Sequence, residues 1–416
     1  MTTTIMYGVL ARIAISDVAR TTVKNCKSPG AGTGEKKTMR LHKMIARGLL
    51  PLAMSAAITA GLAAPSHAAD KKLKIFLSMS YIGNDWQAEA ENEIRAMAAS
   101  KSLRDKVDLR IQVAGPNAQR QIQQINSMVQ AGANAILVYP ISPTALNAVV
   151  KNACQRGVIV AAYDSVISEP CAYNFHIDQL LWGKNQANWL VKQLNGKGNI
   201  VLINGVPGTS VDLLRKQGEL EVLKNYPDIH IVAQANGMWS QAVARTELSK
   251  IIATHPWTSI DGVLMQAGCY TANAMQKEAG IADDKLRPCG GEASNGGRLQ
   301  MLPAGTQVDG ANGSYRPMGA HRMSSGSQNF SGALALKRVV EKLEGKDIPK
   351  LTVIEQNLVT NDNIKLCETG SWAEMRAGCN VFKPSLIPNP GWFASVYSPD
   401  VPEVGVQGAL TGKPEE

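Results

Sequence analysis

Six of the seven cysteines follow residue 150, and their spacing is the clearest chemical pattern in the chain. They form three groups of two that are close in sequence, which favours three disulfides, each closing a short loop worth roughly 3 kcal/mol in the loop-entropy model. The alternative is that some remain buried thiols. No Cys-x-x-Cys or Cys/His spacing indicates zinc. The favoured pairs are Cys154 with Cys171, Cys269 with Cys289, and Cys367 with Cys379.

Spacings typical of catalysis are missing from the sequence. It has no G-x-S-x-G nucleophile motif. The loop from Gly205 to Gly208 lacks a following Gly-Lys-Ser/Thr, so it is interpreted as a tight strand-to-helix turn rather than a phosphate loop. The later histidines are scattered, at His176, His230, His255 and His321. We therefore expect no catalytic residue, no metal and no cofactor, and we do not expect an enzyme.

Short β-rich runs alternate with helical patterns from about residue 73, as in a parallel α/β sheet. Apolar residues recur at helical spacing over 86–97. Ser142 followed by Pro143 predicts the start of a helix that ends near Gly157. Strands are predicted at 74–77, 107–113, 135–139 and 158–163.

The same alternation then restarts, as a second lobe would require. A long helix is expected over 333–343, and others around Trp189, Leu213, Leu248 and Met275. The fold class is therefore predicted as α/β, with two doubly wound parallel-sheet lobes. The further strands are predicted at 199–203, 229–234, 262–266, 287–290 and 351–358.

The alternation fails from about Asn363. Prolines become frequent there, and Cys367 and Cys379 lie among them. This composition indicates an irregular, disulfide-tied extension over 363–416 that packs on the surface.

The net charge of +9 is concentrated at the beginning of the chain. Residues 1–69 hold nine Lys and Arg against two acidic residues, and the remainder holds 34 against 32. A body so close to neutral gives no indication of a phosphate-tracking surface, so we expect no nucleic-acid partner.

Three of these basic residues belong to a predicted signal peptide over 39–68, which begins at Met39 or Met44. Arg40, Lys43 and Arg47 precede an apolar run from 49 to 64, which is too short for a membrane span. Small residues then predict cleavage after Ala68 and export to a periplasm. Our hypothesis is that residues 1–38 precede the true start codon; the mass of exported protein tests this.

Residues 73–362 resemble the periplasmic sugar-binding proteins of the ribose/galactose type. The matching stretches are KIFLSMSYIGNDW, QINSMVQAGANAILVYPIS, GVIVAAYDS, GVPGTSVDLLRKQG and ATHPWTSIDGVLMQ. The resemblance implies a hinge of three crossings between the lobes, near His176, Ser314 and Lys350. The first lobe is then 69–176 plus 314–349, and the second 177–313 plus 350–362.

The resemblance also implies a ligand site at the carboxyl ends of strands. The positions that match the family's ligand residues, together with one at the expected second crossing, are Ser80, Asn84, Trp86, Asp164, Arg215, Trp239, Glu292 and Tyr315. Such side chains suit a sugar or polyol, because carboxylates and guanidinium groups bind hydroxyls while indole faces cover C–H surface. Ser165 stands where ribose binders have an arginine, which argues against ribose itself.

Each of these residues also has an interpretation without a ligand. Asp164 and Glu292 can be solvated loop acids, Arg215 can be a surface helix residue, and Trp86 and Trp239 can be core residues.

The resemblance implies a monomeric receptor that captures its ligand and delivers it to ABC permease subunits in the inner membrane. A sensory binder that presents a ligand to a chemoreceptor or kinase, or a binder of a non-sugar small polar molecule, remains an alternative. A transcription factor with this fold would need a DNA-binding helix-turn-helix where the signal peptide stands.

Overall fold

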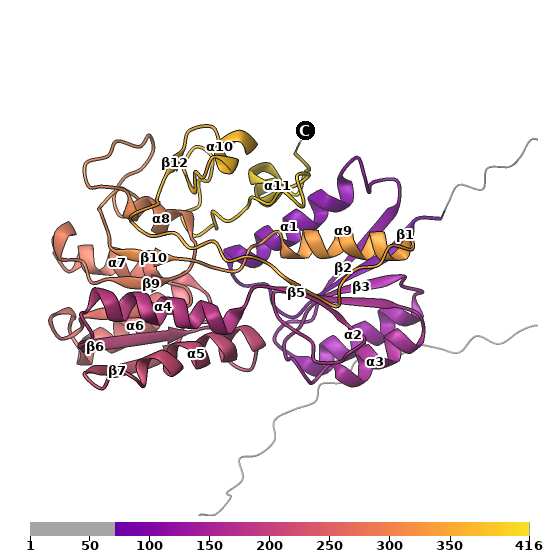
Figure 1. The fold of residues 1–416 in the computed structure, drawn as a ribbon, viewed down its shortest axis with the longest axis horizontal. Coiled ribbons are helices and arrows are strands. Elements are labelled where there is room, and N and C mark those ends of the chain that lie inside the picture. The colour runs from indigo at the N-terminus through magenta and orange to yellow at the C-terminus, as the bar shows by residue number, and fades with distance from the viewer. Residues whose placement is uncertain (1–70, 416) are drawn as a thin grey trace, which may run out of the picture. The chain divides into compact units, whose positions relative to one another are not determined.

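In this computed structural model the described part of the chain is residues 71–415. The predicted leader, with the proposed start codon and the cleavage after Ala68, lies outside these residues. Within them the chain forms two parallel sheets with helices packed on both faces of each (Figure 1). The predicted class, α/β with two doubly wound lobes, is confirmed.

The first lobe contains a six-stranded parallel sheet. Its strand order is β11 (Leu351–Val353), β5 (Tyr173–His176), β4 (Ile159–Tyr163), β3 (Ala135–Tyr139), β1 (Leu73–Met79) and β2 (Val107–Val113). Successive side chains of a strand point to opposite faces, so Leu77 contributes to one core and Phe76 to the other. The helices are α1 (Asp85–Ala99) and α9 (Ser331–Leu343) on the Leu77 face, and α2 (Ala118–Gln130) and α3 (Asn147–Gln155) on the Phe76 face.

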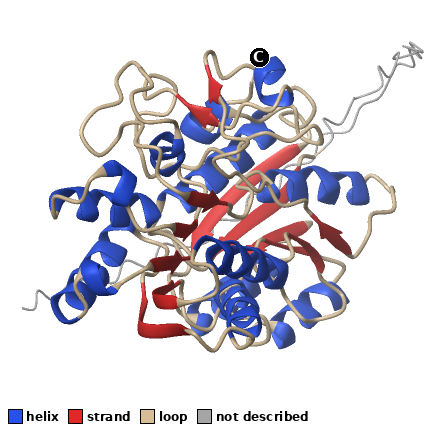
Figure 2. Ribbon diagram, turned by 60° about the vertical axis from the view of Figure 1, so that its left-hand side comes forward, coloured by secondary structure: helices blue, strands red, loops and turns tan. Residues whose placement is uncertain are grey.

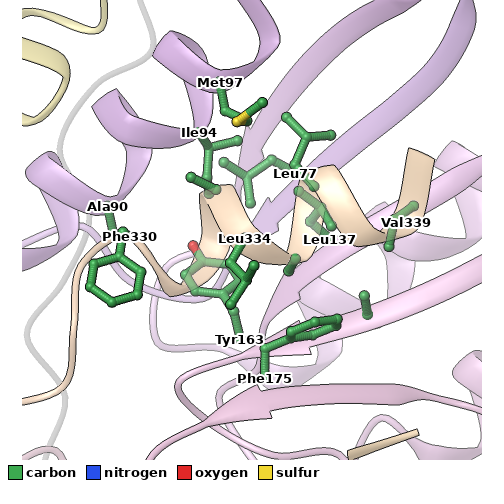
Figure 3. Close-up of a cluster of buried hydrophobic side chains, with 14 of the residues drawn as sticks. Leu77, Ala90, Ile94, Met97, Leu137, Tyr163, Phe175, Phe330, Leu334 and Val339 are labelled. Atoms are coloured by element: carbon green, nitrogen blue, oxygen red, sulfur yellow. The ribbon is translucent and has the colours of Figure 1, made fainter. Parts of the chain in front are cut away.

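The larger core of this lobe lies under α1 and α9. Figure 3 shows Ile94 of α1 and Leu334 of α9 with Leu77 and Leu137 of the sheet. All four side chains are almost completely buried. Burial of an aliphatic side chain contributes about 1.5–3 kcal/mol, so these contacts fix the two helices on the sheet.

The second lobe repeats this arrangement with five parallel strands. Their order is β10 (Arg322–Ser324), β9 (Cys289–Gly291), β8 (Gly262–Met265), β6 (Gly198–Asn204) and β7 (Ile229–Asn236). Ile203 and Leu202 of β6 belong to the cores on opposite faces. The helices are α6 (Gln241–Thr254) and α7 (Cys269–Glu278) on the Ile203 face, α4 (Gln179–Gln193) and α5 (Ser210–Leu223) on the Leu202 face, and α8 (Asn295–Met301) nearer the C-terminal segment.

The chain passes between the lobes three times. The first passage follows β5, close to the predicted His176. β10 pairs with β9 of the second sheet, so the next passage comes after Ser324 rather than near Ser314. β11 pairs with β5 of the first sheet, so the last passage comes after Val353 rather than near Lys350. These short strands have too few residues for a clear alternation, which explains the different boundaries.

One predicted helix start is wrong. Ser142 accepts backbone N–H groups of Thr144 and Ala145, but these residues form a turn, and α3 begins at Asn147. The predicted strand over 351–358 is also shorter than expected, because only β11 pairs regularly and Val359 forms an isolated bridge with Ser324.

Residues 363–415, here called the C-terminal segment, contain only short elements and loops (Figure 2). Irregular structure was predicted, but the segment does more than pack on the surface: Val401 and Val404 are completely buried in the core of the first lobe. The elements are β12 (Leu366–Cys367), β13 (Val381–Phe382), α10 (Trp372–Arg376) and α11 (Val406–Thr411).

Three disulfides join the described cysteines in the pairing favoured by the sequence. The Cα–Cα distances are 6.4 Å for Cys154–Cys171, 5.8 Å for Cys269–Cys289 and 5.1 Å for Cys367–Cys379. Each lobe and the C-terminal segment therefore carries one cross-link. Among residues 71–415, no helix combines the length and apolar character that a membrane span requires.

Candidate functional site

A cavity with an empty volume of about 380 Å³ is lined by both lobes. Its lining residues come from the ends of strands, from the loops and helices that follow them, and from the passage after β10, with one residue from the C-terminal segment. The ends of strands are the usual position of a ligand site in a doubly wound fold. They are Asn84, Trp86, Tyr139, Asp164, Val211, Arg215, Trp239, Gln266, Ala267, Gly326, Ser327 and Phe393.

The topology of the sheets explains why these residues meet. Tyr139 is the last residue of β3, Asp164 directly follows β4, and Gln266 directly follows β8. Parallel strands end on the same edge of a sheet, so the loops of each lobe converge there. Asn84 is the N-cap of α1, and its side-chain oxygen accepts the Gln87 backbone N–H.

A polar network of four side chains connects the lobes. Gln179 Nε2 donates to Asp164 Oδ1 and to Ser327 Oγ, each at 3.0 Å. Arg215 donates from Nε to Gln179 Oε1 at 2.8 Å and from Nη2 to Ser327 Oγ at 2.9 Å. The Arg215 guanidinium also lies 4.2 Å from the centroid of Trp182. Hydrogen bonds and stacking together fix its orientation.

Close packing of α4 on α5 brings Gln179 and Arg215 together. A Cβ atom at Gly183 would lie 2.1 Å from the Arg215 carbonyl oxygen, and one at Gly218 would lie 2.2 Å from the Leu180 carbonyl oxygen. Only glycine permits backbones to approach so closely. The glycine three residues after Arg215 is therefore part of what positions the guanidinium.

Burial opposes the charges of Asp164 and Arg215 in the cavity. It raises the pKa of Asp164 and lowers the pKa of Arg215, and the attraction between the two groups offsets part of each shift. Asp164 is 4% exposed and Arg215 is 5% exposed. Two buried charges of opposite sign leave the cavity close to neutral overall.

Aromatic rings supply the apolar surface of the cavity. Trp86 and Tyr139 lie with ring centroids 5.8 Å apart, and Trp86 Nε1 donates to the Ser327 carbonyl at 2.9 Å. Trp239 Nε1 donates to Gln266 Oε1 at 2.9 Å. A Cβ atom at Gly205 would lie 2.0 Å from Trp239 Nε1, so the predicted turn also makes room for the indole.

Two of the lining residues have left-handed backbone conformations. Asp164 has φ of 58° and Trp239 has φ of 52°. Such angles are costly for residues other than glycine and cluster at functional sites. The two strained backbone positions therefore belong to residues whose side chains line the cavity.

The structure brings five of the eight predicted site residues to the cavity: Asn84, Trp86, Asp164, Arg215 and Trp239. Ser80, Glu292 and Tyr315 do not line it. Ser80 is completely buried at the end of β1, and its hydroxyl has no hydrogen-bond partner among the described residues.

Glu292 lies beneath the beginning of α7. Its carboxylate accepts the backbone N–H groups of Gly268 and Cys269 and the Ser294 hydroxyl, and it pairs with Arg322 at 3.3 Å. Burial alone would raise the pKa of Glu292, but Arg322 and the hydrogen bonds together lower it. The carboxylate is thus occupied by protein donors.

Tyr315 contacts the C-terminal segment. Its hydroxyl donates to the Ile387 carbonyl at 2.9 Å and accepts from Asn295 at 3.1 Å. Burial raises the pKa of Tyr315 to about 12, so the phenol is a neutral donor here.

Several cavity residues were not predicted. Tyr139 and Gln266 end predicted strands, so the rule for strand ends was sufficient to find them. Ser327 lies in the second passage between the lobes, which was placed too early. No pattern near Phe393 indicated that it would reach the cavity.

Metal ligation has no support in the described part of the chain. Residues 71–415 contain no group of three or more His, Cys, Asp or Glu side chains placed to hold an ion. The cavity instead offers hydrogen-bonding groups and ring faces, an arrangement chemically suited to a small polar molecule.

Comparison with known proteins gives related sequences. A xylitol-binding protein of Mycolicibacterium smegmatis is 27% identical over 254 residues, which cover 60% of this chain and 68% of that protein. The galactofuranose-binding protein YtfQ of Escherichia coli is 29% identical over 248 residues, which cover 57% of this chain and 74% of that protein.

The fold is shared with solved structures. An ABC transporter solute binding protein from Thermobispora bispora matches with a TM-score of 0.61 and 24% identity, covering 70% of this chain and 87% of that chain. Residues 75–332 match the family described as "Periplasmic binding protein domain". The match extends over more than half of the sequence and includes strands of both sheets, so the chain belongs to the periplasmic binding protein family.

Proposed function

We propose that this chain is the periplasmic solute-binding component of an ABC importer, which captures a sugar or polyol in the cavity between its lobes and delivers it to a membrane permease. The observation that carries the proposal is the cavity itself. Asp164 and Trp86 from the first lobe face Arg215 and Trp239 from the second across one small space.

A ligand in this position would hold the lobes together. It would contact side chains of both lobes at once, and those contacts exist only when the lobes are close. Ligand would therefore shift a hinge equilibrium toward the closed form, which is the form that a permease can distinguish. No catalytic step is required.

The electrostatics of the cavity favour an uncharged ligand. Asp164 and Arg215 balance one another, so a sugar acid would bring an uncompensated charge into a buried site. Hydroxyl groups can donate to the carboxylate and accept from the guanidinium. The relatives named for xylitol and galactofuranose support the same class, a neutral sugar or polyol.

We further propose that the ligand contacts Asn84, Trp86, Asp164, Arg215 and Trp239, together with Gln266 and Ser327. The two indoles would cover C–H surface of the ligand, and the remaining groups would bind its hydroxyls.

The proposed periplasmic location depends on cleavage of the leader, so mature protein from the periplasm should begin at Ala69. N-terminal sequencing of the exported protein tests this.

Thermal stability tests the binding proposal directly. Residues 69–416, purified under oxidising conditions, are unfolded and refolded to remove bound ligand, then melted with pentoses, hexoses, deoxy sugars, sugar acids and polyols. A ligand at about one hundred times its dissociation constant should stabilise the protein by roughly 2.7 kcal/mol. No shift with any neutral sugar or polyol would overturn the proposed ligand class.

Delivery to a permease needs a second experiment. Cells lacking this chain should lose uptake of the radiolabelled ligand identified by melting, and should regain it with wild-type protein but not with a variant that cannot bind. Unchanged uptake in the deleted strain would exclude the transport role while leaving the binding result intact.

A further inference from the structure

The C-terminal segment contributes one residue, Phe393, to the cavity. The family match ends at residue 332, so this contribution lies outside the part of the chain that the family describes. Phe393 lies more than sixty residues beyond that point, and no other residue that lines the cavity comes from the C-terminal segment.

The backbone around Phe393 is attached to both lobes. The Phe393 N–H donates to Glu89 Oε1 of α1 at 2.8 Å, and Glu89 Oε2 accepts from Asn329 at 2.7 Å. On the other side, Phe393 forms an antiparallel bridge with Ser294, and the Ala394 N–H donates to the Ala293 carbonyl at 3.0 Å. The Phe393 ring thus projects from a short extended stretch whose backbone is hydrogen-bonded to both lobes.

Further contacts hold the segment on each side of this stretch. Asn295 and Phe382 exchange two hydrogen bonds of 2.8 Å, which attach the segment to the second lobe. Asn389 Nδ2 donates to Asp85 Oδ1 at 3.0 Å at the beginning of α1, and α11 packs against α1. These contacts fix where the Phe393 ring can lie.

The ring lies where the cavity meets an open groove. The groove is lined by Ile82–Asp85, by Trp239–Ala242 and by Gly391, and its empty volume is about 870 Å³. Cavity and groove share four lining residues: Asn84, Trp239, Ala267 and Phe393. A Cβ atom at Gly326 would lie only 3.2 Å from Phe393 Cε1, so the ring also packs closely on the passage after β10.

We propose that Phe393 is a specificity-determining residue that closes the cavity toward the groove and limits the ligand to a single sugar ring or a short polyol. This inference rests on the proposed function. The ring covers apolar surface of the ligand and excludes water from its hydrogen bonds. Removing the ring joins the cavity to the groove, which gives a second sugar unit a place to lie.

Replacement of the ring tests the proposal with two readouts. Wild type, F393A and Y397A are titrated by calorimetry with D-xylose, D-galactose, xylitol, and the disaccharides maltose and lactose. Tyr397 lies on the same segment, packs on Trp372 and does not line the cavity, so Y397A is the matched control. F393A should bind the best single-unit ligand at least tenfold more weakly and should gain measurable disaccharide binding, while Y397A should match wild type.

The outcomes separate this proposal from the proposed function. Wild-type protein that binds no single sugar or polyol, either in this titration or in the melting panel, overturns both proposals. Wild-type protein that binds a single-unit ligand, with F393A binding it equally well and still rejecting disaccharides, overturns the role of Phe393 alone. If F393A does not fold, F393L and F393V replace it, and single-unit affinity should then fall with side-chain size; equal affinities would again overturn the proposal.

Discussion

Two buried acids directly follow strands of this protein, each with a buried arginine nearby, and they differ in what surrounds the carboxylate. In the second lobe, Glu292 pairs with Arg322 and accepts two backbone N–H groups and a hydroxyl. In the cavity, Asp164 accepts from Gln179, has the Ser327 hydroxyl as a further partner but no backbone N–H donor among residues 71–415, and shares the space with Arg215. Both acids are buried, at 1% and 4% exposure.

The pKa directions of the two acids express this difference. Protein donors lower the pKa of Glu292 despite its burial, whereas the pKa of Asp164 stays raised despite Arg215. A carboxylate satisfied by the protein stabilises the fold, and one left with unused capacity is available to a ligand. Residue type and position after a strand do not separate the two cases; the surrounding donors do.

Removing the Glu292 carboxylate should have the largest effect on stability. E292A leaves Arg322 buried without its counter-charge, and breaking a buried pair in this way costs about 3–5 kcal/mol. We expect a large loss of unfolding free energy in urea, without a specific loss of affinity in the protein that remains folded.

A surface pair provides the control for this loss. Glu278 pairs with Arg245, and both side chains are about half exposed, so E278A should cost under about 1 kcal/mol. If E292A melted like wild type but no longer bound ligand, Glu292 would be a ligand-binding residue like Asp164. The distinction drawn between the two acids would then be wrong.

D164N should weaken ligand binding strongly and change the stability of the ligand-free protein little, the converse of E292A. Loss of the charge-assisted bonds to ligand hydroxyls should weaken binding on the order of 100-fold, about 2.7 kcal/mol, while the ligand-free melting temperature changes far less than in E292A. D178N is the matched control, because Asp178 is exposed and asparagine retains its helix cap. Calorimetric affinity and ligand-free melting curves decide the result; unchanged affinity in D164N would exclude Asp164 from the site.

Much of the fold is predictable from local pattern. The runs at 135–139 and 262–266 are strongly apolar and bounded by turns, and both became central strands. β10 and β11 are three residues each and pair only through tertiary contacts, so the passages between lobes were displaced. Ser142 has the features of a helix cap, but the chain needs another turn before α3.

A site residue was predictable where it both matched a ligand position of the family and followed a predicted strand. Asp164 and the two indoles met both conditions, whereas Arg215 lies within α5 and was found from the family resemblance alone. Glu292 also follows a strand, but Arg322 lies 30 residues away in sequence and occupies the carboxylate. Phe393 reaches the cavity through a segment without periodicity, held by contacts such as Glu89 to Phe393 that span 304 residues. Such placement depends on long-range packing and has no local signal.

A third buried acid, Glu219 on α5, extends the comparison, because its titration should make the stability of the protein depend on pH. Burial raises the pKa of Glu219 to about 8, although Arg215 opposes the shift. The folded state then keeps a proton that the unfolded state loses near its ordinary pKa of 4.5. Stability from this group is complete below that pKa and is lost as pH rises through about 8. The slope is at most about 1.4 kcal/mol per pH unit.

E219Q should remove that slope. Urea unfolding of wild type and E219Q at pH 5, 6, 7 and 8 should show the wild type losing stability relative to the variant as pH rises. E221Q is the matched control, because hydrogen bonds from Lys184 and Gln217 lower the pKa of Glu221. That carboxyl therefore stays largely ionised in both states across this pH range, and the E221Q curve should run parallel to wild type. Parallel curves for wild type and E219Q would show that Glu219 titrates normally.

Trp239 combines the two situations and should give the smallest effect. Its indole N–H donates to the protein's own Gln266, just as the Glu292 carboxylate accepts from protein donors. The residue also lines the cavity, as Asp164 does. W239F keeps a ring and loses one hydrogen bond, worth about 1 kcal/mol, so affinity should fall about fivefold. W239A also removes the ring surface and should bind more weakly than W239F. Equal affinities of the two variants would mean that ligand does not contact the ring, and Trp239 would then serve only to orient Gln266.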